Sequence, residues 1–328
     1  MTAPLVSVRD LAVRFVSRDA PVNAVNGISF DLARAEVMTI LGESGSGKSV
    51  TLKAMMRLLP EKKSAIAGKV VIDGNDMLSL DAGTLADVRG TAVSMIFQEP
   101  MLAFDPVFTI GEQITETITR HEPVTQAAAL QRALDLLELV QIPSAKRRLD
   151  AYPHEMSGGM RQRAMIALAL SCRPALLLAD EPTTALDATV QIQILLLLRQ
   201  LQRELGMAVI FVTHDVGVAV EIADRVAVMY AGRFVETGPL AAVIRERRHP
   251  YTAGLLASTV HGAMRGRRLE TIPGAPPNLA NPITGCAFAP RCSHVAEACR
   301  GADIPEFWPA ADHMARCLRL TPAAASAD

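Results

Sequence analysis

A short run of small and charged residues, Gly42 to Ser49, has the composition of a phosphate-binding loop. It reads GESGSGKS and fits the pattern G-x-x-x-x-G-K-[ST] between an expected strand and an expected helix. Glycines in such a loop let main-chain N–H groups surround phosphate oxygens, Lys48 neutralises the β- and γ-phosphates, and the Ser49 hydroxyl can ligate Mg²⁺. The alternative is a flexible glycine turn, which the Lys-Ser pair and the strand-helix context disfavour. The residues expected to bind nucleotide are Gly42, Glu43, Ser44, Gly45, Ser46, Gly47, Lys48 and Ser49.

Two adjacent acids, Asp180 and Glu181, end the apolar stretch ALLLADEP. Asp180 at the tip of an expected strand is placed to hold the water shell of Mg²⁺. Glu181, one residue further, could polarise an attacking water as a general base. A pair of solvated acids at a strand end is the commoner case when it occurs alone, but a phosphate loop in the same chain favours the catalytic interpretation.

Two further polar residues end expected strands. Gln98 follows in MIFQEP and His214 in VIFVTHD. In open α/β sheets, ligands collect at the carboxyl ends of the strands. We therefore expect Gln98 to contact the metal or the water and His214 to contact the γ-phosphate, although either could simply be a satisfied hydrogen-bonding residue.

A second possible anion site is the turn formed by Ser157, Gly158 and Gly159, which precedes the expected helix MRQRAMIALALS. A Ser-Gly-Gly turn that opens a helix presents main-chain N–H groups and the positive end of the helix dipole. Ser157 could also cap its own helix. Since the chain already contains a better phosphate loop, the residues alone leave open which anion this turn binds.

The elements around these residues predict an α/β fold. Residues 5 to 40 alternate as antiparallel strands do, whereas EVMTILG, PALLLADEP and MAVIFVTHD read as buried strands of a parallel sheet with helices on both faces. Residues 101 to 163 have helical spacing and predict a helical insertion. After HPYTAGLL the composition becomes rich in Pro, Gly and Asn, so we expect a nucleotide-binding domain over residues 1–250 and an extension over 251–328.

Composition narrows the function classes. The 328 residues are 50% hydrophobic and 20% charged, with a net charge of -1, and no dense block of Lys and Arg occurs. Nucleic acid is therefore not an expected partner. The N-terminus lacks the pattern of a secretory signal, and no window of 18 uncharged apolar residues occurs. We expect the chain to stay in the cytosol and to do any membrane work beside a separate membrane protein.

Four of the five cysteines cluster near the end of the chain. Intervals of 5, 6 and 17 residues separate Cys286, Cys292, Cys299 and Cys317. Such a cluster in a reducing compartment suggests a metal centre. The tight C-x₂₋₄-C knuckle of zinc sites is absent, and the wider intervals suit an iron-sulfur cluster better. Reduced, unligated thiols are the alternative, and Cys172 is expected to be a buried small residue.

The order of these motifs resembles the nucleotide-binding subunit of ABC transporters, over residues 5 to 245. The resemblance implies a P-loop NTPase core in which two subunits face each other head to tail. The Ser157-Gly158-Gly159 turn of one subunit then caps the γ-phosphate of ATP held by the other. It also implies that Asp187, in TTALD, communicates across the dimer, and that Phe15 stacks on adenine, although a core phenylalanine is an equal alternative.

The tail resembles the C-terminal extension of ATPases that drive oligopeptide, dipeptide and nickel importers, through HPYTAGLL, IPGAPPNL, GCAFAPRC, EAC and ARC. It implies a four-iron four-sulfur cluster on the four cysteines. It also implies two transmembrane permease subunits, a second ATP-binding subunit and an extracytoplasmic solute-binding protein. Such an ATPase lies peripherally on the cytoplasmic side of the inner membrane, and peptides are the expected cargo.

Two other function classes remain for comparison. A soluble ABC-type ATPase switch usually carries two nucleotide domains or long coiled coils, whereas this sequence has one phosphate loop and no sustained heptads. A subunit that only binds ATP is disfavoured because Lys48, Asp180, Glu181 and His214 are all present. Within the transporter class, nickel or another small solute is the alternative cargo.

Overall fold

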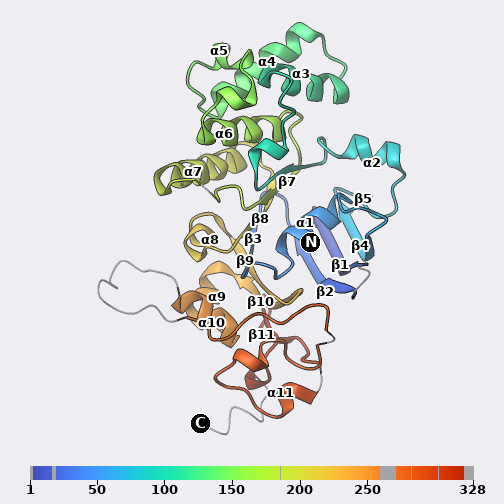
Figure 1. The fold of residues 1–328 in the computed structure, drawn as a ribbon, viewed down its shortest axis with the longest axis vertical. Coiled ribbons are helices and arrows are strands. Elements are labelled where there is room, and N and C mark those ends of the chain that lie inside the picture. Colours follow the sequence, from blue (N-terminus) through green and yellow to red (C-terminus); the bar gives the residue numbers. More distant parts are fainter. Residues whose placement is uncertain are drawn as a thin grey trace. The chain divides into compact units, whose positions relative to one another are not determined.

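The computed structural model describes residues 3–16, 20–184, 186–258, 271–281, 283–301 and 303–320, and Figure 1 shows its elements. The chain divides into two compact units. The first contains Met1–Ser7, Asp31–Glu36 and Val71–Phe211. The second contains Val8–Phe30, Val37–Val70 and Val212–Asp328. No helix among the described residues is both long and apolar enough to cross a bilayer.

Short apolar strands form the sheet of the first unit, in the order β8-β7-β6. β6 (Val93–Ile96) pairs in parallel with β7 (Leu176–Asp180), and Ile96 lies opposite Ala179. β8 (Ala208–Thr213) is buried along its whole length. Strands covered on both faces need apolar residues at every position, which explains the continuous apolar runs in the sequence.

The helical part of the first unit confirms the prediction of an insertion rich in helices. It contains α3 (Ile110–His121), α4 (Gln126–Leu139), α5 (Ala145–Leu149) and α6 (Gly158–Ala169). Thr109 begins α3 with a capping box, because its hydroxyl accepts a hydrogen bond from Glu112 N and the Glu112 carboxylate accepts one from Thr109 N. The insertion is expected to begin at residue 101. The short turn η1 (Pro100–Leu102) lies there instead, and the first α-helix of the insertion, α3, begins at Ile110.

Two further helices of the first unit flank its strands in the sequence. α2 (Ala82–Val88) begins at Asp81, whose carboxylate accepts hydrogen bonds from the N–H groups of Gly83 and Thr84. α7 (Ala188–Leu205) follows β7 and buries one apolar side, including Ile194 and Leu198, in the core, whereas Ile192 and Leu196 are exposed. The remaining short turn, η2 (Pro153–Glu155), precedes α6.

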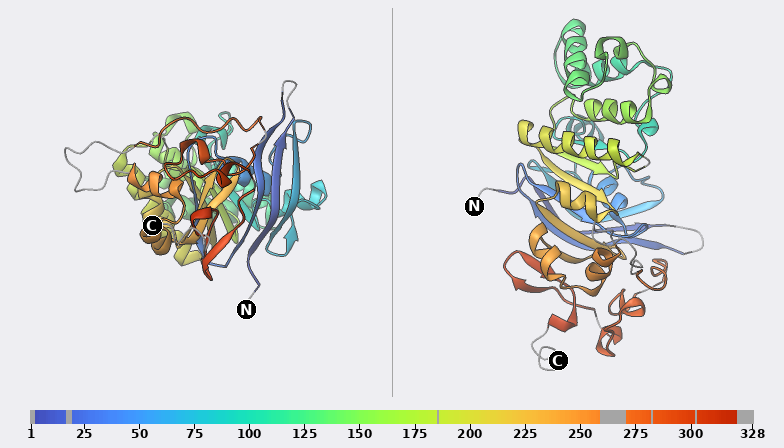
Figure 2. Two further views of the ribbon diagram at one scale, coloured as in Figure 1. Left: turned by 90° about the horizontal axis from the view of Figure 1, so that it is seen from below. Right: turned by 90° about the vertical axis from the view of Figure 1, so that its left-hand side faces the viewer.

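A four-stranded sheet, mostly in the second unit, accounts for the alternating N-terminal sequence. Its order is β2-β1-β4-β5. The strands are β1 (Val6–Phe15), β2 (Val22–Leu32), β4 (Ser64–Ile72) and β5 (Asn75–Asp76). Figure 2 shows β1 and β2, in blue, as long neighbouring strands. The pairing of β4 with β5 is antiparallel.

The second unit also contains a mixed set of strands in the order β11-β12-β10-β9-β3. β3 (Val37–Leu41) and β9 (Arg225–Tyr230) run parallel. β10 (Arg233–Pro239), β12 (His313–Ala315) and β11 (Phe307–Ala310) add to this edge in antiparallel fashion. The part of the chain after residue 300 therefore continues the same sheet as β3.

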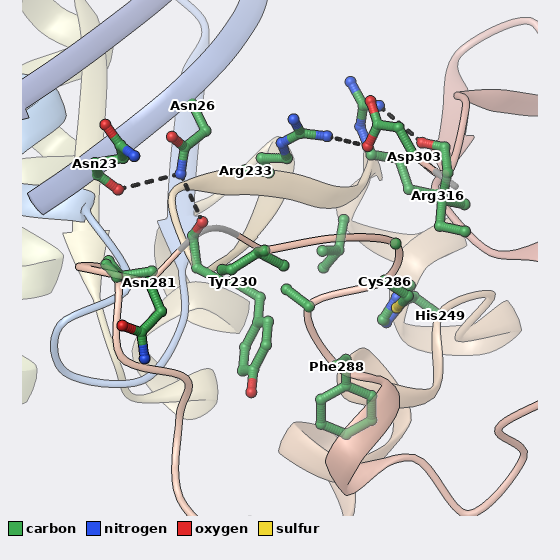
Figure 3. Close-up of a pocket in the computed structure, with 17 residues that line it drawn as sticks. Asn23, Asn26, Tyr230, Arg233, His249, Asn281, Cys286, Phe288, Asp303 and Arg316 are labelled. Atoms are coloured by element: carbon green, nitrogen blue, oxygen red, sulfur yellow. Dashed lines mark hydrogen bonds and ion pairs between the residues drawn. The ribbon is translucent and has the colours of Figure 1, made fainter. Parts of the chain in front are cut away.

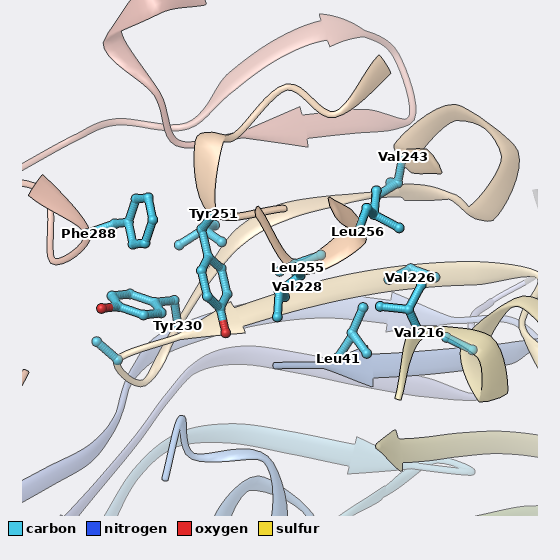
Figure 4. Close-up of a cluster of buried hydrophobic side chains, with 13 residues drawn as sticks. Leu41, Val216, Val226, Val228, Tyr230, Val243, Tyr251, Leu255, Leu256 and Phe288 are labelled. Carbon is cyan, nitrogen blue, oxygen red and sulfur yellow. The ribbon is translucent and has the colours of Figure 1, made fainter. Parts of the chain in front are cut away.

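Helices and short turns complete the second unit. The helices are α1 (Lys48–Met55), α8 (Val216–Ile222), α9 (Leu240–Glu246), α10 (Pro250–Ala257) and α11 (Ala298–Gly301), with turns η3 (Ala289–Arg291) and η4 (Leu318–Leu320). One buried cluster joins strand, helix and extension, and Figure 4 shows Leu41, Val228, Tyr230, Tyr251 and Phe288 within it. Tyr251 on α10 and Phe288 in the extension thus share a core with β3 and β9.

A buried acid fixes the outer strand of this sheet. Glu236 on β10 has no exposed surface, and its carboxylate accepts hydrogen bonds from the N–H groups of Arg248 and His249. His313 on β12 makes a third contact, with 2.8 Å between its Nε2 and Glu236 Oε1. Because a buried carboxylate needs several partners, Glu236 binds β12 and the start of α10 to β10.

Candidate nucleotide-binding site

The phosphate loop, Gly42 to Ser49, joins β3 to α1 within the second unit. Two of its glycines are required by space: a Cβ at Gly42 would lie 2.3 Å from the Met229 carbonyl oxygen, and one at Gly47 would lie 2.4 Å from the Ala24 carbonyl oxygen. Gly45 and Gly47 also have φ angles of 78° and 108°, which L side chains rarely adopt. The backbone therefore makes the tight turn that the sequence pattern predicts.

The interior of the loop is polar and ready for an anion. Lys48 is 4% exposed, and its Nζ donates to the carbonyl oxygens of Gly42 at 2.8 Å and Glu43 at 3.0 Å. The Ser46 hydroxyl is buried, with no hydrogen-bond partner among the described residues. α1 begins at Lys48, after Gly47, so the loop lies at the positive end of a helix dipole. These features suit phosphate.

Glu43 has partners of a different kind from those expected. Its carboxylate accepts two hydrogen bonds from Arg291, at 2.7 and 2.9 Å. The side chain therefore pairs with the C-terminal extension, and a contact between Glu43 and nucleotide falls to its main chain. No pattern in the sequence indicates this pair, because the two residues lie 248 positions apart.

Two other residues from the sequence analysis lie in the second unit. Phe15 is the last residue of β1 and is half-buried, so it is not part of the fully buried core. His214 follows β8 and is exposed. The neighbouring Asp215 caps α8, because its Oδ1 accepts a hydrogen bond from Gly217 N at 2.7 Å.

The acids and the glutamine lie together in the first unit. Ile96 and Ala179 are paired across the parallel strands β6 and β7, so Gln98, just after β6, and Asp180, the last residue of β7, lie at the same edge. Asp180 is 2% exposed. Glu181 has a φ of 45°, in the left-handed region, and its Oε2 accepts a hydrogen bond from the Thr184 hydroxyl at 3.0 Å. Left-handed backbone at a non-glycine residue is strained and concentrates at functional sites.

The Ser-Gly-Gly turn caps α6, also in the first unit. Ser157 Oγ accepts a hydrogen bond from Met160 N at 3.3 Å, so this serine does cap its own helix. A Cβ at Gly159 would lie 3.1 Å from a methyl group of Val190 at the start of α7. Asp187 caps α7 by accepting from Val190 N at 3.0 Å. The structure thus brings the starts of α6 and α7 together.

Comparison with known proteins identifies the chain. A family model described as ABC transporter matches residues 25–184, and a model described as oligopeptide/dipeptide transporter, C-terminal region, matches residues 235–299. A protein of Brucella melitensis, named for peptide import and ATP binding, is 48% identical over 96% of this chain and 97% of its own length. The chain belongs to the ABC transporter family. It is an ATP-binding cassette ATPase.

Further relatives agree with this ABC ATPase assignment. The oligopeptide transport ATP-binding protein OppD of Bacillus subtilis is 46% identical over 97% of this chain and 89% of its own length. Among solved structures, the ATP-binding cassette MJ0796, a dimer bound to ADP and Pi after hydrolysis, has a TM-score of 0.64 at 28% identity. The match covers 72% of this chain and 98% of the MJ0796 chain. The expectation of a P-loop NTPase fold is confirmed.

The four C-terminal cysteines of this ABC ATPase line one small hollow in the second unit, together with His249 and Phe288. Burial raises the pKa of the Cys286 thiol, and the neighbouring thiols Cys299, Cys317 and Cys292 raise it further. Within the described ranges, no group of three or more His, Cys, Asp or Glu side chains is arranged to hold a metal ion.

The described residues therefore do not show the expected four-iron four-sulfur cluster, although the four cysteines expected to bind it line one hollow. Cys172, by contrast, is a buried small residue as expected, 8% exposed and with its pKa raised by burial.

A larger cavity of about 290 Å³ lies beside this hollow and is distinct from the phosphate loop. Figure 3 shows Tyr230 and Phe288 on one side of it and Asn26 on another. Its polar groups bind one another: Asn26 Nδ2 donates to the Asn23 and Ala231 carbonyl oxygens, and Arg233 pairs with Asp303. No residue of the phosphate loop lines this cavity, so we do not assign ATP to it.

Proposed function

We propose that this ABC ATPase powers the import of dipeptides or oligopeptides. The observation that carries the proposal is the match of residues 235–299 to the C-terminal region of oligopeptide and dipeptide transporters. Relatives named for peptide import extend the similarity to 96% of the chain, so it is not confined to the cassette common to all ABC proteins. The tail is the part of the sequence that separates this branch from other ABC ATPases.

In the proposed assembly, two ATP-binding subunits face each other, and two transmembrane permease subunits hold them at the cytoplasmic side of the inner membrane. An extracytoplasmic solute-binding protein delivers the peptide. The dimeric state of the related cassette with ADP and Pi supports the paired arrangement. The second subunit is either another copy of this chain or a homologous one.

Each ATP is held between the phosphate loop of one subunit and the Ser157-Gly159 turn of the other. The loop and Lys48 bind the β- and γ-phosphates, and Phe15 stacks on adenine. When bound, Mg²⁺ would neutralise charge on the phosphates. Ser49 and Gln98 would hold the ion directly, and Asp180 would hold its water shell.

Hydrolysis follows from three more side chains in this proposal. Glu181 orients and deprotonates the attacking water, His214 hydrogen-bonds the γ-phosphate, and Asp187 transmits the state of one site to the other. The cap that Ser157 places on α6 supports its role, because it fixes the helix N-terminus that would face the partner's γ-phosphate.

The test of cargo is uptake by the reconstituted transporter. The chain is co-purified from membranes with its permease subunits, placed in vesicles with ATP inside, and supplied with labelled dipeptide, labelled oligopeptide or nickel. We expect ATP-dependent peptide uptake, which Lys48→Ala abolishes. Uptake of nickel but not of peptide would show that nickel is the cargo. ATP hydrolysis by a chain that never associates with permeases would favour a soluble ATPase switch.

We also propose a four-iron four-sulfur cluster on Cys286, Cys292, Cys299 and Cys317. Four thiols line one hollow, and four cysteine thiolates are the ligands that such a cluster uses. A cluster of several iron atoms does not need the thiols to be as close together as a single metal ion does. Anaerobically purified protein is expected to contain iron and acid-labile sulfide, and Cys286→Ser should lower both. Zinc alone, or no metal, would remove this proposal.

A further inference from the structure

Glu43, the second residue of the phosphate loop, is held by the region after residue 250 at two points. Its N–H donates to the Tyr251 hydroxyl at 2.9 Å, and its carboxylate accepts the two hydrogen bonds from Arg291. Its carbonyl oxygen in turn accepts from Lys48 Nζ. A direct chain of contacts therefore runs from Arg291 through Glu43 to the lysine that faces the phosphates.

Arg291 is itself firmly positioned. Its side chain is 4% exposed, Nε donates to the Pro273 carbonyl oxygen at 2.8 Å, and Nη1 also donates to the Tyr230 hydroxyl at 3.3 Å. The guanidinium carbon lies 5.8 Å from the ring centres of both Tyr230 and Phe288. A planar guanidinium held on this many sides presents a rigid fork that matches one carboxylate.

The aromatic rings beneath Arg291 are equally well fixed. Tyr230 and Tyr251 are almost fully buried, and their ring centres are 4.5 Å apart. Phe288 packs against both, at 5.4 Å from each. The two groups that hold Glu43, the Tyr251 hydroxyl and the Arg291 guanidinium, are thus positioned by the same cluster of aromatic rings.

The charge of Glu43 makes this pair matter for nucleotide. A carboxylate in the loop that binds triphosphate would repel it unless a cation is paired with it. The loop pattern tolerates any residue at this position, so the pattern gives no reason for an acid here. Arg291 supplies the cation, and the Glu43 hydrogen bonds raise the pKa of Arg291 above its ordinary value, so the guanidinium stays charged.

We propose that Arg291 is a positioning residue for ATP: through Glu43 it sets the shape and charge of the phosphate loop, so that ATP affinity depends on the C-terminal extension. Arg291 does not touch the nucleotide in this scheme. It rests on ATP binding by the phosphate loop, which Lys48→Ala tests independently.

The decisive experiment is a double-mutant cycle on ATP binding by the full chain. The Kd of ATP is measured by calorimetry for wild type, Arg291→Gln, Glu43→Gln and the double variant. We expect Arg291→Gln to weaken ATP binding by about tenfold, because it leaves the Glu43 carboxylate unpaired beside the phosphates. The double variant should recover most of this loss, since no unpaired charge remains.

A merely structural role for Arg291 predicts a different outcome. Lost packing would weaken the single and the double variant alike, and the two substitutions would then show no coupling. If the Kd of the double variant lies within about twofold of the value expected from adding the two single effects, the proposal is overturned. Arg300→Gln, an exposed arginine in the same extension, is the matched control and should bind ATP as wild type does.

A second variant and a kinetic measurement extend the test. If Arg291→Gln fails to fold, Arg291→Lys keeps the charge but loses the fork, and we expect about a threefold weaker Kd that Glu43→Gln no longer worsens. In the assembled transporter, the loss should appear in KM for ATP with kcat changed less, because the chemistry uses other residues. A fall in kcat alone would contradict a positioning role. Wild-type protein that binds no ATP would instead refute the proposed function.

Discussion

At the scale of single residues, Glu181 combines a carboxylate, a strained backbone and a place next to the strand end that carries Asp180. We predict that Glu181→Gln retains ATP binding but lowers turnover by about a hundredfold or more, because it removes the base and preserves the shape. Phosphate release and ATP Kd of the assembled transporter measure the two effects separately. Glu221→Gln, an exposed acid on α8, serves as control, and phosphate release from Glu181→Gln close to the wild-type rate would exclude Glu181 as the base.

The individual residues differ in how well the sequence predicts them. The glycines, Lys48 and Ser49 follow from one short pattern, because phosphate chemistry fixes both type and spacing. The partner of Glu43 does not, since Arg291 and Tyr251 come from distant segments and pair with it only after folding. A loop acid without a role in the pattern was the one signal that could have prompted a search for a cation.

At the scale of elements, the start of α10 contains a titratable group in an unusual state. His249 is buried, its Nδ1 accepts a hydrogen bond from Tyr251 N at 3.0 Å, and burial lowers its pKa from 6.5 to about 3. The folded protein therefore holds this histidine neutral, whereas the unfolded chain binds a proton near its ordinary pKa. The stability that follows is present above the unfolded pKa and is lost as the pH falls below it.

We predict that the free energy of unfolding falls by about 2 kcal/mol more in wild type than in His249→Asn between about pH 7 and about pH 5. Asparagine is chosen because its side-chain oxygen can accept the same N–H at a helix start without titrating. Denaturant unfolding curves at several pH values provide the measurement. Equal pH dependence in the two proteins would mean that His249 is protonated or accessible in the folded state.

Element types were predictable where the period is strong. The apolar runs of β3, β7 and β8 and the amphipathic α4 need no tertiary information, because burial on both faces or on one face sets their pattern. The last strands, β11 and β12, carried no such signal: β11 contains a proline and an exposed Trp308, and both strands are short. Their place beside β10 is determined by pairing and by Glu236, which only the structure reveals.

At the scale of the whole molecule, the shared ATP site can be tested by pairing differently tagged copies of the chain. Lys48→Ala disables a phosphate loop, and Ser157→Arg blocks the turn that faces the partner. If the sites are shared, a pair of one Lys48→Ala copy and one Ser157→Arg copy keeps one intact site. A pair of one doubly substituted copy and one wild-type copy keeps none.

We predict that only the first pair retains tightly bound ATP, at about half the wild-type amount, because one of two sites survives. Nucleotide content of the purified pairs is the readout. The opposite result, retention only in the second pair, would mean that each subunit closes its own site. Ser157→Asn, which keeps a helix-capping side chain, separates the steric block from loss of the cap on α6.

The pairing of β12 with β10 has a consequence for how this protein can fail. A chain that ends before residue 313 would leave backbone N–H and C=O groups of β10 exposed to solvent. Glu236 would also lose its contact with His313. An uncovered strand of this kind recruits strands from other molecules. Shortened copies should therefore aggregate through β10, with light scattering rising more steeply than concentration, while scattering by the intact ATPase stays proportional to concentration.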